Sequence, residues 1–292
     1  MPVVAAVKKA FTNIFVLSWD VSLTLINLVS PKRKIGHVTP KGFPGHDGKW
    51  PEYIAPSSED SRCACPALNA MANHGILPRD GKNISFKELN HAIRTTFNFA
   101  PSFCFFVPHF SADMLHKPYS KGTFDLEELS LHNGIEHDAS LCREDVVHQP
   151  DQGTPHLPFI KELLATATGK DAEGNPLLTP ADLSAYSSKR RVDARETNPE
   201  FTLSFFHKMF GSSNSSTLLT ILGGRIKDIE PFLVDERIPD GWESRIRAPM
   251  GLTLMTFNRT VLKVERGIDE KKYLASENET AQAPATAPSP SS

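Results

Sequence analysis

A cysteine at the start of a short predicted helix constrains this chain more than any other feature. Cys65 precedes Pro66, which suits the first helical position because its missing N–H has no helical partner there. Ala, Leu and Met then favour helix, and Gly75 suits a left-handed C-terminal cap. The free N–H groups of such a helix are expected to lower the pKa of the Cys65 thiol and to favour the thiolate. A thiolate held in this way can be a nucleophile, a redox thiol or a metal ligand.

Composition restricts the class of protein. The chain has 292 residues and a net charge of −2, so one large domain or two small ones fit its length, and nothing in the charge indicates a nucleic-acid partner. Its cysteines are too few for a disulfide framework in a chain of this length. They are Cys63, Cys65, Cys104 and Cys142.

Residues 10–30 form an apolar segment that is long enough to cross a bilayer. Asp20, near its centre, would cost roughly 2.5–3.5 kcal/mol on the membrane-insertion scale. No clear small-residue cleavage site follows. The segment is equally compatible with a membrane anchor or membrane-surface helix and with an amphipathic helix that packs on the domain. A location in the secretory pathway or at a membrane depends on that choice. The segment lies between two basic runs, Lys8-Lys9 and Lys32-Arg33-Lys34.

The remaining patterns predict an all-α protein with long, Pro-rich loops. A hydrophobic helix in residues 1–35 and a helical domain in residues 36–273 precede a tail, 274–292, whose Ala, Pro, Ser, Thr and Glu composition predicts disorder. Capping signals at Ser85 and Thr179 each predict the start of a helix. Apolar runs predict further helices at residues 125–129, 158–167, 201–209, 216–222 and 229–236.

A second string, from Glu136 to Ser140, gathers groups that can bind a metal or move a proton. It reads Glu-His-Asp-Ala-Ser, and its oxygen ligands suit a hard divalent cation such as Mg²⁺ or Mn²⁺. Alone, such a triplet is more often a solvated helix face.

Together these strings resemble the fungal haem-thiolate peroxidases, the family of chloroperoxidase and the unspecific peroxygenases. The resemblance covers roughly residues 36–250 and implies a single haem-binding helical domain of chloroperoxidase type. Such a domain would use hydrogen peroxide to oxidise or oxygenate a small organic substrate, or to oxidise a halide. The matching strings are Cys65–Asn69, Ala72–Arg79, Glu136–Ser140 and Glu236–Trp242.

The resemblance implies a role for each matched residue. Cys65 would be the axial thiolate on the iron of haem b, a ligand that favours O–O cleavage. Pro66, Ala67 and Leu68 would lie beside that haem. A Mg²⁺ or Mn²⁺ ion would bind beside a haem propionate. Its ligands would be Glu136, the backbone at His137, and Ser140.

The distal side departs from the family pattern. The family uses an acid, usually Glu, to move a proton between the two peroxide oxygens. By spacing, that acid should fall near Asn214, and an amide cannot relay a proton as a carboxylate does. His207 could take its place as imidazole acid–base, with Glu200 and Glu196 as further candidates. His137 and Asp138 are expected to orient groups on this side.

Two alternatives remain beside the peroxidase hypothesis. The Asn214 replacement would also suit a haem-binding protein with altered or lost peroxide chemistry. A structural metal site of Cys63, Cys65 and His74 is the other alternative, although a one-residue spacing is unusual for zinc. His74 is better explained as a hydrogen-bonding residue at the helix end. Ala64 stands where the family has proline before the cysteine, which changes the stiffness of this loop.

Overall fold

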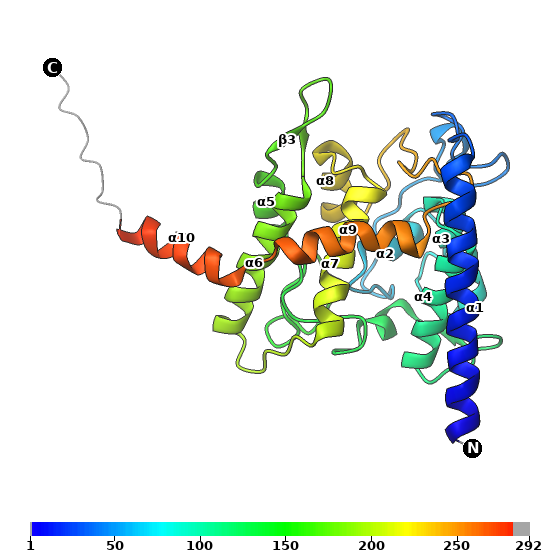
Figure 1. Ribbon diagram of the computed structural model, residues 1–292, viewed down its shortest axis with the longest axis horizontal. Coiled ribbons are helices and arrows are strands. Elements are labelled where there is room, and N and C mark those ends of the chain that lie inside the picture. Colours follow the sequence, from blue (N-terminus) through cyan, green and yellow to red (C-terminus); the bar gives the residue numbers. More distant parts are fainter. Residues whose placement is uncertain (1, 283–292) are drawn as a thin grey trace.

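The computed structural model describes the backbone of residues 2–282 and the side chains of residues 11–279, and this part of the chain is mostly helical (Figure 1). The predicted all-α class is confirmed. The helices are α1 Pro2–Val29, α2 Pro66–Asn73, α3 Phe86–Phe97, α4 Pro101–Met114, α5 Leu157–Ala165, α6 Pro180–Thr197, α7 Phe205–Thr220, α8 Ile226–Val234, α9 Leu254–Gly267 and α10 Glu270–Gln282. Two short 3-10 helices are η1 His46–Gly48 and η2 Leu126–Ser130.

Strand is confined to two short antiparallel pairs in the described residues. Strand β1, Ile84–Ser85, pairs with β2, Thr123–Phe124, and β3, Gly169–Lys170, pairs with β4, Pro176–Leu177. In the first pair Ile84 lies opposite Phe124, and both side chains are buried. These pairs join loops rather than form a layer.

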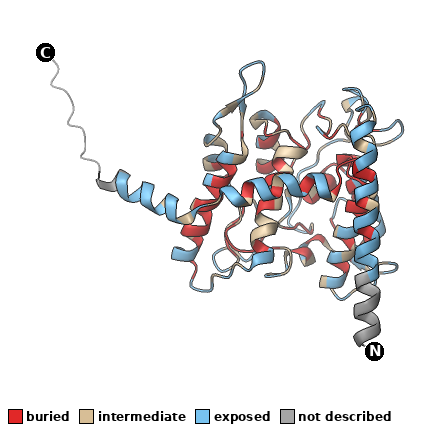
Figure 2. Ribbon diagram, in the orientation of Figure 1, coloured by how far each residue is buried: buried red, intermediate tan, exposed pale blue. Residues whose placement is uncertain are grey.

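Helix α9 lies at the centre of the packing, with α6 and α7 against it. Helix α3 packs on α4, and α8 contacts both α2 and α5. Figure 2 shows the buried residues concentrated where these helices meet, while α1 and α10 are largely exposed at the two sides of the molecule. The largest buried apolar side chains include Phe86, Phe97, Phe124, Phe232 and Met71.

The predicted capping signals start two helices. The Ser85 hydroxyl accepts the N–H of Glu88 at 3.1 Å and caps α3. At the start of α6 the Thr179 hydroxyl accepts the N–H of Asp182 at 3.2 Å, and the Asp182 carboxylate accepts the N–H of Thr179 at 2.7 Å. Both caps satisfy N–H groups that have no partner within the helix.

The two helices predicted at residues 201–209 and 216–222 are wrong as separate elements. The structure has one helix, α7, capped by Ser204 and continuous through the serine-rich middle. Serines weaken isolated helices by competing for backbone groups, but here two of them are taken up by tertiary contacts. Ser212 donates to the Glu265 carboxylate at 2.6 Å, and Ser216 donates to the Phe257 carbonyl at 3.3 Å, both on α9.

The predicted disorder of the tail is also wrong in part. Residues up to Gln282 form α10, which packs against α6. An ion pair between Arg195 of α6 and Glu270 of α10 joins the two helices at their contact. The rest of the predicted tail, 283–292, lies outside the described residues. At the other end, Phe11–Val29 is long and apolar enough to cross a membrane by length and composition.

Candidate functional site

Cys65 is the N-cap residue of α2. Its backbone is extended, with φ −90° and ψ 107°, and Pro66 occupies the first turn of the helix. The residue is exposed, and no other side chain bonds to its sulfur. The backbone N–H groups of Leu68 and Ala67 approach that sulfur from the helix start. The sequence predicted this position, a sulfur at the start of a helix and close to helical N–H groups.

The pKa of the Cys65 thiol is raised, whereas the sequence predicted that it would be lowered. Although Cys65 is exposed as a whole residue, the protein around its thiol displaces water, and this desolvation raises the pKa of the thiol. The N–H groups of Leu68 and Ala67 lower that pKa, as expected, but desolvation is the larger effect, and the charge of Glu236 adds to it. The free thiol is therefore less acidic than the helix geometry alone indicates.

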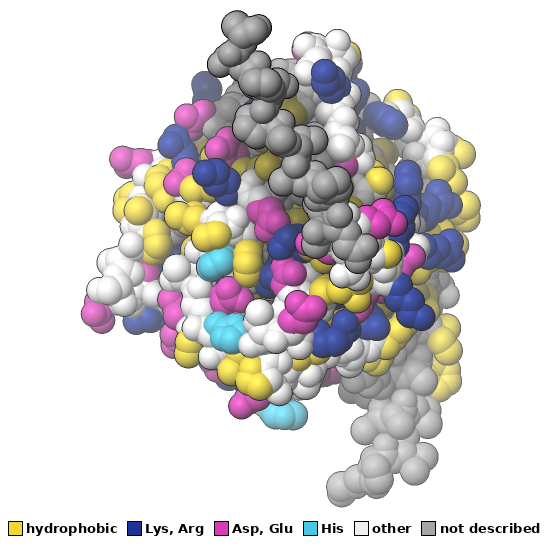
Figure 3. All heavy atoms as spheres, turned by 90° about the vertical axis from the view of Figure 1, so that its left-hand side faces the viewer, with side chains coloured by type: hydrophobic (Ala, Val, Ile, Leu, Met, Phe, Trp, Pro, Cys, Tyr) yellow, Lys and Arg dark blue, Asp and Glu magenta, His cyan; other side chains and the backbone are white. Residues whose placement is uncertain are grey.

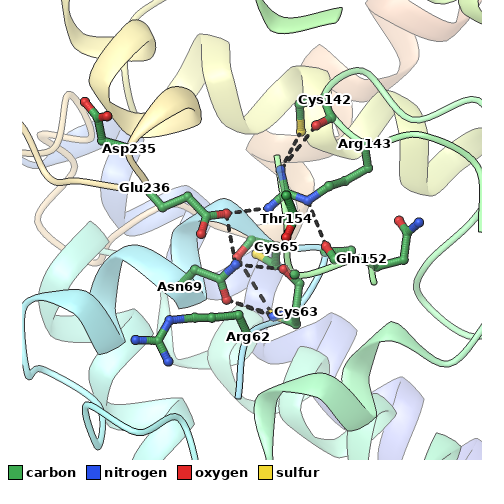
Figure 4. Close-up of polar contacts among 12 residues, drawn as sticks. Arg62, Cys63, Cys65, Asn69, Cys142, Arg143, Gln152, Thr154, Asp235 and Glu236 are labelled. Atoms are coloured by element: carbon green, nitrogen blue, oxygen red, sulfur yellow. Dashed lines mark hydrogen bonds and ion pairs between the residues drawn. The ribbon is translucent and has the colours of Figure 1, made fainter. Parts of the chain in front are cut away.

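A hydrogen-bond network holds the loop that carries Cys65 (Figure 4). The N–H of Cys63 donates to Asn69 Oδ1 at 2.9 Å, and Asn69 Nδ2 donates to the Cys63 carbonyl at 2.7 Å. Asn69 Nδ2 also donates to Glu236 Oε1 at 2.9 Å. Asn69 of the first matched string thereby connects the cysteine loop to Glu236, the first residue of the last matched string.

Glu236 is also ion-paired with Arg143, and both side chains are buried (Figure 4). Arg143 Nε donates to the Gln152 carbonyl at 2.8 Å. Burial raises the pKa of the Glu236 carboxyl, while Arg143 and Asn69 act to lower it. Sequence reasoning missed Arg143, because nothing in its local pattern distinguishes it from a surface arginine.

His74 is engaged through both ring nitrogens. Its Nδ1 lies 2.6 Å from the Pro51 carbonyl, and its Nε2 accepts the N–H of Ile238 at 3.1 Å, which assigns a neutral ring with the proton on Nδ1. His74 therefore acts as a hydrogen-bonding residue and has no lone pair left for a metal shared with Cys63 and Cys65. Among the described side chains, no group of three or more His, Cys, Asp and Glu could hold a metal ion.

One small cavity, with a volume of about 10 Å³, is lined by three residues that the sequence placed on the distal side, His137, His207 and Asn214. Glu200 does not join them, because it is exposed in the loop between α6 and α7, and Glu196 is exposed near the end of α6. The other residues that line the cavity are Asp138, Ala139, Leu141, Ser187, Arg191, Leu203 and Gly211.

The two histidine rings of this cavity are stacked with their centroids 6.2 Å apart. His137 Nδ1 lies 2.7 Å from the Asp138 carbonyl, so this nitrogen carries the proton and Nε2 is the basic atom. Burial is the main cause that lowers the pKa of His137 to about 4. His207 Nε2 lies 3.3 Å from the Asn133 carbonyl, while its Nδ1 is buried without a partner. Both rings thus keep one nitrogen free of strong protein hydrogen bonds.

Asp138 adds a carboxylate to the same cavity. Its Oδ2 accepts the N–H of Thr202 at 2.8 Å, and its Oδ1 is buried without a hydrogen-bond partner. Burial raises the pKa of this carboxyl. Gly211 allows α7 to approach closely, because a Cβ at that position would lie 3.2 Å from His137 Cε1.

The predicted cation ligands lie just before and after this cavity segment. The Glu136 carboxylate is buried, its Oε2 lies 2.7 Å from His132 Nδ1, and burial raises its pKa. The Ser140 carbonyl accepts a hydrogen bond from Arg190 Nε at 3.0 Å. A cation at Glu136 would have to displace the His132 ring from the carboxylate.

Known proteins match this chain over the segment that carries these residues. The family model described as "Peroxidase, family 2" matches residues 51–247. Chloroperoxidase from Leptoxyphium fumago is 51% identical over 51 residues, 18% of this chain and 13% of that protein. Dothistromin biosynthesis peroxidase dotB from Dothistroma septosporum is 30% identical over 134 residues, 40% of this chain and 32% of that protein.

A third relative aligns over a longer stretch. Aromatic peroxygenase from Coprinellus radians is 26% identical over 246 residues, 74% of this chain and 90% of that protein. The chain thus matches less than two thirds of the length of the first two relatives and most of the third. The family model covers more than half of the chain and includes Cys65, the Glu136–Ser140 string and Glu236. The chain therefore belongs to peroxidase family 2, the fungal haem-thiolate family of chloroperoxidases and peroxygenases.

Proposed function

We propose that this protein is a haem-thiolate peroxidase or peroxygenase in which the Cys65 thiolate would hold haem b. The observation that carries the proposal is Cys65 at the start of α2, an exposed residue whose sulfur has no side-chain partner and is approached by backbone N–H groups. This geometry fits a thiolate ligand whose negative charge is stabilised from behind. When bound, the haem would supply the redox chemistry that peroxide and substrate undergo.

The raised pKa of the free Cys65 thiol is compatible with this role. A metal binds the thiolate and releases its proton, so ligation itself shifts the protonation equilibrium. With haem bound, the N–H groups of Ala67 and Leu68 would stabilise the negative charge on the Cys65 sulfur. Pro66 would keep the start of the helix from rearranging.

His207 and His137 are the proposed acid–base groups. The free nitrogen of His207 would accept a proton from one oxygen of hydrogen peroxide and donate it to the other, which leaves as water, while the haem, when bound, would supply the two electrons that O–O cleavage requires. His137, neutral at physiological pH because its pKa is lowered to about 4, would accept a hydrogen bond through Nε2 and orient that exchange. Asp138 and Asn214 would position the peroxide through their side-chain oxygens.

A small organic molecule with an apolar body is the proposed substrate class. Phe205 and Phe206 are 72% and 71% exposed on the first turn of α7, directly before His207. Exposed aromatic rings beside a catalytic group suit an apolar ligand that is only partly enclosed. The names of two relatives, a biosynthetic peroxidase and an aromatic peroxygenase, agree with this class.

A divalent cation would complete the site on the Glu136 side. Glu136, the backbone carbonyl of His137 and the Ser140 hydroxyl would supply the oxygen ligands that Mg²⁺ or Mn²⁺ prefers. Its binding would offset the cost that now raises the pKa of buried Glu136. Glu136→Gln should weaken cation binding measured by calorimetry on the haem-loaded protein, whereas Glu144→Gln should not.

The test of the central proposal is spectroscopic. The haem-loaded protein should give, with carbon monoxide after reduction, the red-shifted Soret band of thiolate-ligated haem. Cys65→Ala should lose this band, while Cys63→Ala, two residues away, should keep it. A thiolate band that survives Cys65→Ala, or a wild-type protein that binds no haem, would overturn the proposal.

A second function remains because the described α7 carries no carboxylate on the cavity side. Asn214 occupies the cavity where the family acid was expected, which favours a haem protein without peroxide turnover. Stopped-flow mixing with peroxide separates the two. Turnover by the wild type supports the peroxidase, whereas turnover that appears only in Asn214→Glu supports the alternative.

A further inference from the structure

Helix α1 is attached to the domain by polar residues. Its buried stripe consists of Val16, Asp20, Leu23 and Thr24, spaced so that all lie on one face. Two of these four are polar, and Asn27, one turn further on, adds a third polar contact. In ordinary surface helices the apolar face is turned inward and the polar face outward. Here that arrangement is reversed.

Asp20 caps another helix from the side. Its Oδ1 accepts the N–H of Leu254 at 2.9 Å, and its Oδ2 accepts the N–H of Met255 at 2.9 Å. These are the first two N–H groups of α9, which have no partner within their own helix. Asp20 also accepts the Ser102 hydroxyl at 2.5 Å, which connects it to α4. Its negative charge lies at the favourable end of the α9 dipole.

The next two polar residues of α1 extend this attachment. Thr24 Oγ1 lies 2.8 Å from Thr253 Oγ1, the N-cap of α9. Asn27 Nδ2 donates to the Gly251 carbonyl at 2.9 Å, and Asn27 Oδ1 accepts the N–H of Met250 at 2.9 Å. A helix bound through these contacts is a structural part of the domain. If it crossed a bilayer with the contacts intact, α4 and α9 would be drawn into the hydrocarbon.

The outer face of α1 is apolar and uncovered in the described structure. In Figure 2 most of this helix is coloured as exposed, and Figure 3 shows hydrophobic side chains along the edge of the molecule above the grey N-terminal end. No acidic or basic residue interrupts this face between residues 11 and 29, since Asp20 points inward. The exposed large apolar residues are Phe11, Ile14, Phe15, Leu17, Val21, Leu25, Ile26, Leu28 and Val29, and the uncharged polar residues Thr12, Asn13, Ser18 and Ser22 are exposed among them.

We propose that the outer face of α1 lies in the headgroup region of an anionic membrane, with the helix parallel to the surface. Charge complementarity selects lipid as the occupant. Lys32 and Lys34 are exposed directly after the helix, followed by Ile35, which is 72% exposed. The sequence places Lys8 and Lys9 before the apolar face. Basic residues at both ends of an uncharged apolar face suit anionic headgroups around an interfacial helix.

Sedimentation of the full haem-loaded chain with vesicles tests the proposal. Binding is expected to vesicles of equal parts phosphatidylcholine and phosphatidylserine, and weaker binding to phosphatidylcholine alone. Substituting four outer residues with glutamine should reduce binding at least about tenfold, because less apolar area enters the interface, while Tm and the Soret spectrum stay unchanged. The four substitutions are Phe11→Gln, Phe15→Gln, Leu25→Gln and Leu28→Gln.

Two matched controls separate this face from general hydrophobicity and from folding. Leu157→Gln with Leu274→Gln replaces exposed leucines elsewhere and should leave vesicle binding unchanged. Asp20→Ala should lower Tm by a few degrees through the lost cap of α9. The proposal is overturned if the wild-type chain does not bind anionic vesicles. It is also overturned if the variant with four substitutions binds vesicles as well as the wild type does. Light scattering gives a further contrary outcome, namely a wild-type dimer that the four substitutions abolish while vesicle binding persists.

Discussion

The Cys65 side and the His137 side of the proposed haem site differ in how completely their buried polar atoms are paired. Behind Cys65, no atom of Asn69, Arg143 or Glu236 is buried without a partner in the described structure, and Gln152 Oε1 is the exception beside them. Around His137, by contrast, Asp138 Oδ1 and His207 Nδ1 are both buried without a hydrogen-bond partner, and the nearest cationic group to Asp138 Oδ1 is His132 Nε2 at 3.9 Å. Pairing of buried polar groups stabilises and rigidifies a region, whereas unpaired groups are costly and mark places that are kept for a ligand or a reaction. We therefore infer that the first region acts as a scaffold, and the second is the proposed reaction site.

If this contrast is right, the largest effect on activity belongs to His207. His207→Ala should lower peroxide-dependent turnover by roughly 10²–10⁴-fold, the usual contribution of a positioned acid–base group. The measurement is steady-state oxidation of a chromogenic substrate by the haem-loaded protein. His148→Ala, an exposed histidine far along the loop, is the matched control. A His207→Ala protein with wild-type turnover would place the acid–base group elsewhere.

The largest effect on stability is expected in the region behind Cys65, at the Arg143–Glu236 ion pair. Arg143→Met should reduce the free energy of unfolding by about 3–5 kcal/mol, because the Glu236 carboxylate is left buried without its partner. Urea titration of the haem-free protein measures this loss. The double variant Arg143→Met with Glu236→Leu should recover most of it, since no charge is then stranded. Equal losses in the single and double variants would show that packing, not the stranded charge, dominates.

The low pKa of His137 predicts a pH dependence with a defined sign. Between pH 6.5 and about 4 the unfolded chain takes up a proton at this position and the folded chain does not, so stability falls as pH falls through this window. For the full pKa shift, His137 contributes about 3 kcal/mol to the pH dependence of the free energy of unfolding. His137→Gln should lose this part of the pH dependence, which is measured by comparing urea midpoints at pH 7 and pH 4.5.

The control for this prediction is to compare the pH dependence of unfolding free energy in the wild type with that in His137→Gln. Burial raises the pKa of the Glu136 and Asp138 carboxyls, so these groups bind protons more tightly when folded and favour the folded state as pH falls. Their effect has the opposite sign, but it is present in both proteins and cancels in the difference. Parallel pH profiles for wild type and variant would refute the neutral, buried state of His137.

The smallest effect lies within the Cys65 region and concerns the pKa of the thiol. Glu236 acts to raise the pKa of Cys65, so Glu236→Gln should increase the thiolate fraction and speed alkylation by iodoacetamide in the haem-free protein, within about threefold. The Cys65→Ala background identifies which thiol reacts. An unchanged or slower rate would show that desolvation alone controls this sulfur.

Local patterns predicted much of the fold because they act over a few residues. The caps at Ser85 and Thr179 and the proline at the start of α2 satisfy helix ends from within the same segment. The continuity of α7 could not be predicted in this way, since its serines are stabilised by Glu265 and Phe257, more than 40 residues later. The same holds for Arg143, whose role depends on Glu236, 93 residues away.

The sequence by itself determined which atoms this protein can use. It placed a cysteine sulfur before a proline at a helix start, a Glu-His-Asp string, and His207 on a later helix. Only the tertiary structure decided what those atoms meet: that burial outweighs helical N–H groups in the pKa of Cys65, that His207 stacks on His137, and that Asp20 caps α9. The physical reason is how far apart along the chain the interacting groups lie. Helix starts depend on neighbours in the chain, while desolvation, pairing and exposure depend on what the rest of the fold brings alongside.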